Sequence, residues 1–200
     1  KYRVHVRVSD EHDPLYLEIL YSLMGLGVEP VREKVLGSFQ LLRYIGLFSQ
    51  FPRSGLGLKR LLCDALSEPR IGIEPCIPRR AVIPADQRLK LGESGHILGR
   101  ESYLGETIDD RTTKFRVEVG PLSSYDYNQY LPGTFKHSKI AALSRLYLMD
   151  PFESELKLTL EAGEARTARL GEEGWCRLGL DTWLISDGYG RRLEAVFELR

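Results

Sequence analysis

Hydrophobic and polar residues alternate in several short stretches of the chain, and this period of two predicts β-strands. The clearest example is KYRVHVRV at the start of the chain, where every second residue is apolar. A weaker example, RIGIEPCI, is interrupted by glycine and proline, which disfavour regular strand pairing. We predict strands at residues 1–8, 70–77, 114–119, 155–161 and 192–199.

A second group of stretches repeats its hydrophobic residues every three or four positions, which predicts helices with one apolar face. A short additional helix is expected to begin at Ser123 or Ser124, because serine caps helix N-termini, and to end near Leu131. The longer helices are predicted at residues 15–24, 36–51, 56–66 and 137–149. This mixture of helices and strands predicts an α+β fold.

Two long stretches, residues 78–113 and 162–190, are rich in glycine and show neither the helical nor the strand period. Structureless loops longer than about 15 residues are uncommon in compact domains and are usually functional or disordered. We therefore interpret these two stretches as protruding arms.

The two arms contain similar sequences, KLGESGHILG and RLGEEGWCRLG. They align from Lys90–Leu104 onto Arg169–Leu184 with one gap, which we place opposite Arg177. The matched positions that we single out as candidate partner-binding residues are Leu91 with Leu170, Gly92 with Gly171, Leu98 with Leu178, Gly99 with Gly179, Tyr103 with Trp183, and Leu104 with Leu184.

The rest of the chain repeats in the same order, since KYRVHV near the start matches KFRVEV at residues 114–119. Self-similarity in a fixed order is the signature of repeated structural units. We infer two tandem duplicated units, each built as strand–helices–strand–long glycine-rich arm–strand. The first unit spans residues 1–120 with its arm at 78–113, and the second spans residues 114–200 with its arm at 162–190.

A duplicated arm favours binding over catalysis. Two linked copies of a binding element raise the effective concentration for the second contact, whereas two copies of an active site in so short a chain are hard to explain. Leucine, tyrosine and tryptophan suit hydrophobic pockets, and the two aromatic types are frequent hot spots. Glycine lets the backbone approach a partner closely. We therefore expect the apolar arm residues to anchor a protein partner and the glycines to shape the backbone.

The composition argues against nucleic acid and membranes as partners. The chain has 200 residues, and its 28 basic and 28 acidic residues cancel, whereas nucleic acid or an anionic membrane demands a basic excess. No stretch approaches the ~20 apolar residues that span a bilayer, so no direct membrane insertion is expected. Cys63, Cys76 and Cys176 are odd in number and widely spaced, which favours reduced thiols in a cytoplasmic protein. No metal-ligand spacing is present, so neither a metal nor a cofactor is expected.

Two other functions are consistent with particular residues. A small hydrolase would use Asp109, Asp110 and His96, and it requires these groups to converge in a polar cleft. A ligand-binding domain would use Trp175 and Trp183 as a stacking platform, and it requires the two rings side by side. We expect no catalytic residues, because adjacent residues of a strand point to opposite faces and solvated turns explain the acidic pair.

The region from about residue 90 to 184 resembles the TssG family, also called ImpH or VasB, of the bacterial type VI secretion system. The shared motifs are Leu104-Gly105, Asp110-Arg111, Lys114-Phe115-Arg116, Gly120-Pro121-Leu122, Tyr127, Tyr130-Leu131-Pro132-Gly133, Leu178-Gly179 and Thr182-Trp183-Leu184. The family's N-terminal region is missing from this sequence, so we expect a fragment of a longer protein.

The resemblance implies a structural subunit of a contractile baseplate wedge, not an enzyme. It implies that the chain binds two trimers of the adaptor TssK through its two arms, and that it joins two copies of TssF and a TssE subunit. It further implies a bacterial cytoplasmic location, docked at the inner membrane through the secretion complex. The arms worked out from the repeat supply the two equivalent contacts that this arrangement needs.

Overall fold

The computed structural model describes residues 14–25, 27, 41–165, 175, 177–183 and 190–199 of the chain. Helices and strands occur in mixed order within these ranges, which confirms the predicted α+β fold. The predicted strand at residues 1–8 lies outside the described residues. By packing, the chain divides into two compact units, residues 1–69 with 139–149 (unit 1) and residues 70–138 with 150–200 (unit 2). This division follows spatial contacts, whereas the predicted repeats follow the order of the chain.

Unit 1 is helical. Two of its predicted helices are confirmed, at residues 15–24 and 56–66, and the second ends at Ser67, which adopts a left-handed conformation. Ser54 caps that helix, because its hydroxyl accepts a hydrogen bond from the backbone nitrogen of Gly57 at 3.1 Å. The unit comprises α1 (Pro14–Leu23), η1 (Leu42–Tyr44), α4 (Ile45–Phe48), α5 (Gly55–Leu66) and most of α7 (Phe135–Tyr147).

The single helix predicted over residues 36–51 is wrong in its described part. Residues 42–44 form a 3₁₀ turn and residues 45–48 form one α-helical turn. The hydrophobic spacing mixes three and four, which suits a 3₁₀ turn followed by an α turn as well as one helix. Periodicity therefore did not distinguish the two.

In unit 1, Arg53 links two segments that are far apart in the sequence. The Arg53 guanidinium donates to the backbone carbonyls of Tyr147 at 2.5 Å and Phe48 at 3.0 Å. It also lies over both aromatic rings, 5.6 Å from the centroid of Tyr147 and 5.4 Å from that of Phe48, where cation–π attraction adds to the hydrogen bonds. These contacts join the end of α7 to the segment before α5.

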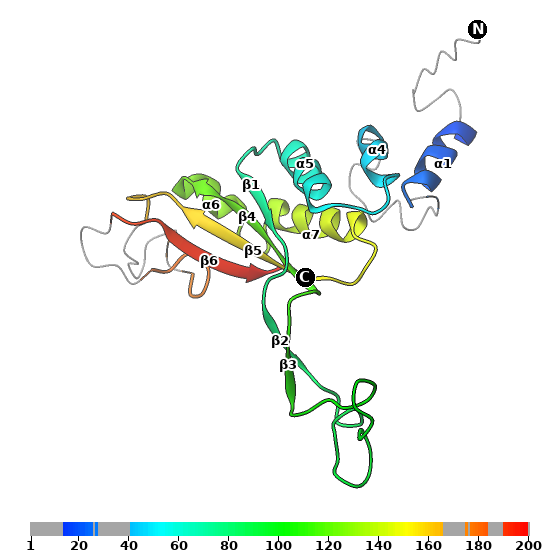
Figure 1. The fold of residues 1–200 in the computed structure, drawn as a ribbon. Helices are drawn as coiled ribbons and strands as arrows, with labels where there is room; N and C mark the ends of the chain where they lie inside the picture. The colour runs from blue at the N-terminus through cyan, green and yellow to red at the C-terminus, as the bar shows by residue number, and fades with distance from the viewer. Residues whose placement is uncertain are drawn as a thin grey trace. The chain divides into compact units, whose positions relative to one another are not determined.

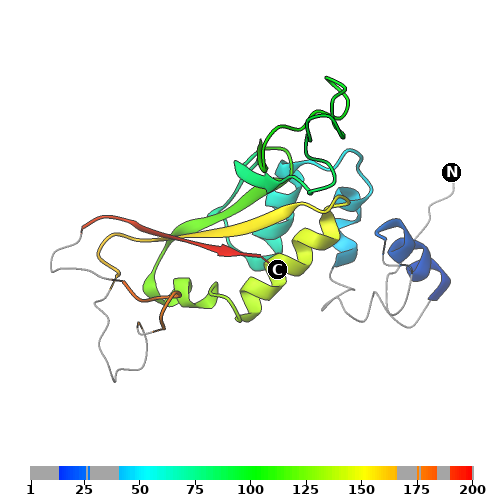
Figure 2. The ribbon, with the colours of Figure 1, turned by 90° about the horizontal axis from the view of Figure 1, so that it is seen from below.

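Unit 2 is built on a four-stranded sheet with the order β1-β4-β5-β6. The inner pair β4/β5 is parallel, and each edge strand runs antiparallel to its neighbour. Figures 1 and 2 show red β6 beside yellow β5, with green β4 on the other side of β5. The strands are β1 (Ile71–Glu74), β4 (Lys114–Leu122), β5 (Glu153–Leu160) and β6 (Leu193–Glu198).

The alternation that predicted these strands divides the sheet into an apolar face and a charged face. Leu156, Leu158 and Leu160 of β5 are fully buried, as their spacing predicted. On the charged face Arg116 bridges two strands, donating to Glu155 at 2.6 Å and Glu74 at 3.0 Å. The sheet is therefore held by hydrophobic burial on one side and by cross-strand ion pairs on the other.

A short helix follows β4 as the serine signal predicted. This helix, α6 (Ser124–Gln129), begins after Ser123, whose hydroxyl accepts a hydrogen bond from the Asp126 nitrogen at 3.2 Å. Tyr127 of α6 is fully buried. α6 therefore presents a rigid, buried aromatic residue to its surroundings in unit 2.

The first arm contains regular structure that the sequence did not predict. Residues 78–113 were expected to lack a strand, yet β2 (Arg79–Val82) pairs antiparallel with β3 (Thr107–Asp110). The apolar alternation is missing because the ribbon is exposed on both sides and buries no continuous face. Its cross-strand partners include two charge pairs, Arg79 with Asp110 and Arg80 with Asp109.

Candidate protein-binding site

The first arm projects from the four-stranded sheet of unit 2. The β2–β3 ribbon carries residues 83–106 away from the sheet, as the green segment of Figure 1 shows. The loop closes where the Ile83 nitrogen donates to the Glu106 carbonyl at 2.9 Å. Arg88 also donates to the Ile83 carbonyl, at 2.8 Å. The arm is thus an ordered extension with a hydrogen-bonded neck.

The base of the arm is fixed by one carboxylate. Asp110 accepts hydrogen bonds from the hydroxyl of Thr113, from the nitrogen and hydroxyl of Thr112, and from Arg79. These bonds, with Thr113 contributing most, hold the pKa of Asp110 far below its usual range. Asp110 therefore stays ionised and joins the ribbon to the turn that leads into β4.

The apolar residues predicted to anchor a partner lie on the surface of this arm. Leu91, Leu98 and Leu104 are 96%, 92% and 80% exposed, and Tyr103 is 45% exposed. Exposed leucines on an extended loop stabilise nothing in the free chain, so they are candidates for a protein contact. Gly92 has a positive φ of +80°, as its proposed role in shaping the backbone requires.

The arm contains a compact turn at residues 97–103, which we call the first tip turn. The Ile97 carbonyl accepts hydrogen bonds from the nitrogens of Arg100 at 3.2 Å and Glu101 at 3.1 Å. Gly99, with φ of +77°, makes the turn, and Leu98 projects from it.

Residues 177–183 form a second tip turn with the same geometry. The Arg177 carbonyl accepts hydrogen bonds from the nitrogens of Leu180 at 3.0 Å and Asp181 at 3.2 Å. Gly179 has φ of +78°, and Leu178 is 92% exposed. The candidate residues Leu170, Gly171 and Leu184 of this arm lie outside the described residues.

The two tip turns match residue by residue. The shared hydrogen bonds place Ile97 with Arg177, so the alignment gap belongs before Arg177 rather than opposite it. Leu98-Gly99 and Leu178-Gly179 then occupy equivalent positions with equal exposure of the leucines. The sequence match between the arms therefore corresponds to a common backbone structure in residues 97–103 and 177–183.

The second tip turn also contains buried contacts that the sequence did not predict. Asp181 is completely buried and pairs with Arg177 at 2.7 Å. Tyr127 of α6 donates its hydroxyl to the Leu180 carbonyl at 3.1 Å. Burial, and then the negative charge of Asp181, raise the pKa of Tyr127 well above its usual range, so the hydroxyl keeps its proton. The only sequence signal was an arginine four residues before an aspartate. Trp183 is half-buried, with its indole nitrogen shielded from solvent.

The two arms leave the sheet from opposite ends. The first arm starts after β1, which runs antiparallel to β4, and returns into the start of β4. The second arm starts at the end of β5, which is parallel to β4. The start of β4 and the end of β5 are opposite ends of the sheet, and the tip turns therefore face separate regions of space.

The residues of the alternative enzyme site do not converge. Asp110 is engaged with its own turn, and Asp109 points away on the opposite face of β3, where it pairs with Arg80 at 3.8 Å. His96 is exposed in the first arm, and no described hydrogen bond joins it to either aspartate. The alternative stacking platform is also absent among the described residues, because Trp175 is buried against Tyr127, with the ring planes 15° apart.

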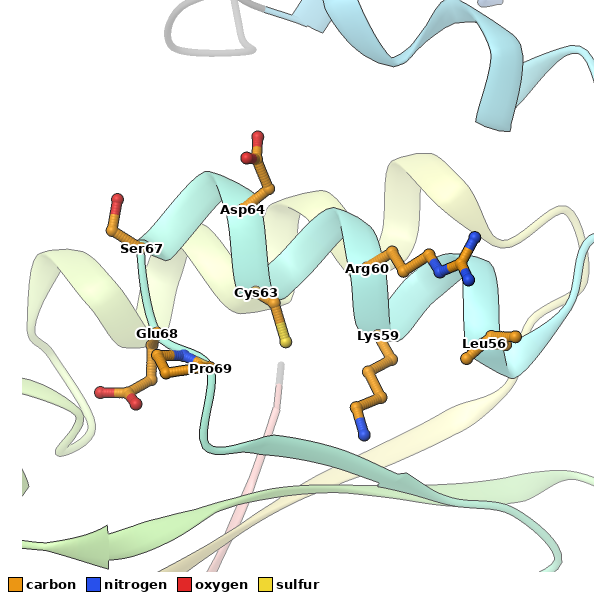
Figure 3. Close-up of a pocket in the computed structure, with 8 residues that line it drawn as sticks. All are labelled: Leu56, Lys59, Arg60, Cys63, Asp64, Ser67, Glu68 and Pro69. Atoms are coloured by element: carbon orange, nitrogen blue, oxygen red, sulfur yellow. The ribbon is translucent and has the colours of Figure 1, made fainter.

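A depression beside α5 offers no better catalytic candidate. Its lining side chains diverge, since Asp64 and Ser67 point to one side of the helix and Cys63 and Lys59 to the other (Figure 3). Asp64 is also occupied by a salt bridge to Arg43 at 3.2 Å. Within the described part of the chain, no group of three or more His, Cys, Asp or Glu residues is arranged to hold a metal ion.

These features define an α+β protein in which a sheet carries loops with exposed leucines. Residues 1–185 match the family described as "Type VI secretion, TssG". The chain belongs to the TssG family. This membership confirms the resemblance seen in the sequence and the prediction of a structural subunit that is not an enzyme.

Two solved structures resemble the fold. A chain of the type VI secretion TssK-TssF-TssG baseplate subcomplex matches with a TM-score of 0.71 and 18% identity, covering 92% of this chain and 79% of that one. A chain of the baseplate complex from the type VI secretion system matches with a TM-score of 0.61 and 19% identity, covering 94% of this chain and 53% of that one. No curated protein matches the sequence. In the described residues, no helix is both long and apolar enough to cross a bilayer.

Proposed function

We propose that this chain is the TssG subunit of a baseplate wedge, and that its two arms each bind one TssK trimer. The observation that supports this most directly is the pair of matched tip turns, each presenting one leucine that is 92% exposed. Placement at opposite ends of the sheet gives each partner its own approach. Leu98 and Leu178 act as the central anchors, and Leu91, Tyr103 and Leu104 widen the contact on the first arm.

The duplicated architecture forms part of this proposal. Both arms connect a strand to its antiparallel neighbour, β1 to β4 and β5 to β6, and a helix precedes β1 and β5 alike. These parallels support two repeat units at residues 1–120 and 114–200.

Further contacts complete the assembly. We propose that two copies of TssF and one TssE subunit bind outside the tip turns, and that TssK connects the assembly to the inner membrane. The solved subcomplex that contains TssK, TssF and TssG supports TssK and TssF as partners. TssE rests on the family resemblance.

The arm contacts are tested by changing one exposed leucine at a time in the full protein. Leu98→Asp and Leu178→Asp place a charge where the apolar contact forms, and neither side chain supports the fold of the free chain. Leu56→Asp, at a leucine of α5 that is 59% exposed, is the matched control.

Native mass spectrometry of the complex with TssK counts the bound trimers. Each single variant is expected to retain one trimer, the double variant none, and the Leu56 control both. Two trimers on either single variant would refute the proposed contacts. Retention of TssF by the double variant is expected, because its site lies elsewhere.

A further inference from the structure

The two tip turns have the same backbone conformation but are stabilised by different side-chain contacts. In the second tip turn the buried carboxylate of Asp181 accepts hydrogen bonds from the Arg177 backbone nitrogen at 2.8 Å and from its guanidinium at 2.7 and 2.9 Å. A carboxylate with a charged partner and a backbone donor makes a strong, directional link. The turn is therefore closed on itself by its own side chains.

The same turn is also attached to α6. The Arg177 guanidinium donates to the Asn128 side-chain oxygen at 2.7 Å, and Tyr127 donates to the Leu180 carbonyl at 3.1 Å. Trp175, just before the turn, stacks on Tyr127 with ring centroids 6.2 Å apart. Because α6 belongs to the packed part of unit 2, these contacts fix where Leu178 is presented.

The first tip turn has different residues at the equivalent positions. Ile97 replaces Arg177, and the exposed Glu101 replaces Asp181. The described hydrogen bonds that support it come from its own loop, such as the Ser102 hydroxyl to the Gly95 carbonyl at 2.8 Å. Nothing equivalent to α6 holds it within the part of the chain that the structure describes.

We propose that α6 presets the second arm for binding, with Tyr127, Asn128 and Asp181 as positioning residues, and that the first arm has no such support. This rests on the proposed role of the arms. A contact that is ordered before binding loses less conformational entropy when the partner arrives. The two TssK sites are therefore inequivalent, and only the second depends on α6.

The test removes one hydroxyl from outside the arm. Tyr127→Phe keeps the buried ring and its stacking on Trp175 but abolishes the hydrogen bond to the Leu180 carbonyl. Tyr125→Phe, at an exposed tyrosine of the same helix, is the matched control. Each change is placed in the full protein in two backgrounds. In the Leu98→Asp background TssK binding measures the second site, and in the Leu178→Asp background it measures the first.

Isothermal titration with TssK gives the affinity of each site. Loss of one hydrogen bond is expected to weaken the second site about threefold to tenfold and to leave the first site unchanged. The Tyr125 control should change neither. Asn128→Ala, which removes a different contact to α6, should reproduce the selective loss. Equal effects on both sites, or none, would overturn the proposal, provided that the melting temperature shows the variants to be folded.

Hydrogen exchange in the free protein separates this inference from the arm function. In Tyr127→Phe the amides of Leu180 and Asp181 should exchange at least threefold faster, while those of Arg100 and Glu101 stay unchanged. Unchanged exchange in the second tip turn rejects the α6 tether even if TssK binds as proposed. Faster exchange together with leucine variants that retain both trimers supports the tether and rejects the binding role.

Discussion

A single backbone constraint at both tips yields the sharpest prediction. Gly99 and Gly179 have φ of +77° and +78°, a left-handed conformation that a Cβ disfavours. A Cβ added at either position meets no heavy atom within 4 Å. Alanine there therefore perturbs the backbone conformation and removes no side-chain contact of the free chain.

The size of the effect follows from the backbone energy. The left-handed conformation costs an alanine about 1–2 kcal/mol. If the alanine turn relaxes to another conformation in the free chain and must return to the left-handed one to bind TssK, that cost appears in the binding free energy. Gly99→Ala or Gly179→Ala should weaken its own site about fivefold to thirtyfold, since about 1.4 kcal/mol is tenfold.

Isothermal titration of the single-site proteins measures this change. Asparagine tolerates the left-handed conformation, so Gly99→Asn and Gly179→Asn should weaken binding less than alanine does. Gly46→Ala, where φ is ordinary and space is open, is the control for the substitution itself. Alanine variants that bind as tightly as the native protein would refute the prediction that a relaxed turn must return to the left-handed conformation on binding.

Three further predictions concern the fold itself. In Gly57→Ala the new Cβ would lie 2.2 Å from the Tyr147 hydroxyl oxygen, so chemical denaturation should show a loss of about 1–2 kcal/mol, and Tyr147→Phe should restore part of it. Asp110→Asn should speed hydrogen exchange of the β2–β3 amides without changing the circular dichroism spectrum, because the charged anchor at the base of the arm is lost. Burial lowers the pKa of His137 below its ordinary 6.5, so the unfolded chain binds the proton more tightly; the free energy of unfolding should fall as the pH drops below about 6.5, and His137→Gln should flatten that dependence.

The sheet strands were predictable because one face of the sheet is buried. Burial of Leu156, Leu158 and Leu160 leaves a period of two in the sequence, and a shift of one residue would expose all three. The β2–β3 ribbon has no buried face, so its sequence lacks this period of two. Arg79 and Asp110 are paired across strands by charge, and charged residues occur equally in turns.

The candidate site was predictable where it repeats and obscure where it does not. Leu98-Gly99 and Leu178-Gly179 stood out because two similar sequences occur in one chain. The attachment to α6 could not be inferred, because contacts such as Tyr127 with Leu180 join residues far apart in sequence and leave no local pattern.

The placement of the arms at opposite ends of the sheet makes the strands a spacer. The eight residues of β5, at about 3.3 Å each, set about 26 Å between the points where the arms depart. Adding one residue to this spacer would turn its buried side chains to the charged face. Two added residues, about 7 Å, would therefore lengthen the spacer and keep its faces, whereas one added residue would need a β-bulge like the register shift between Val119 and Leu122.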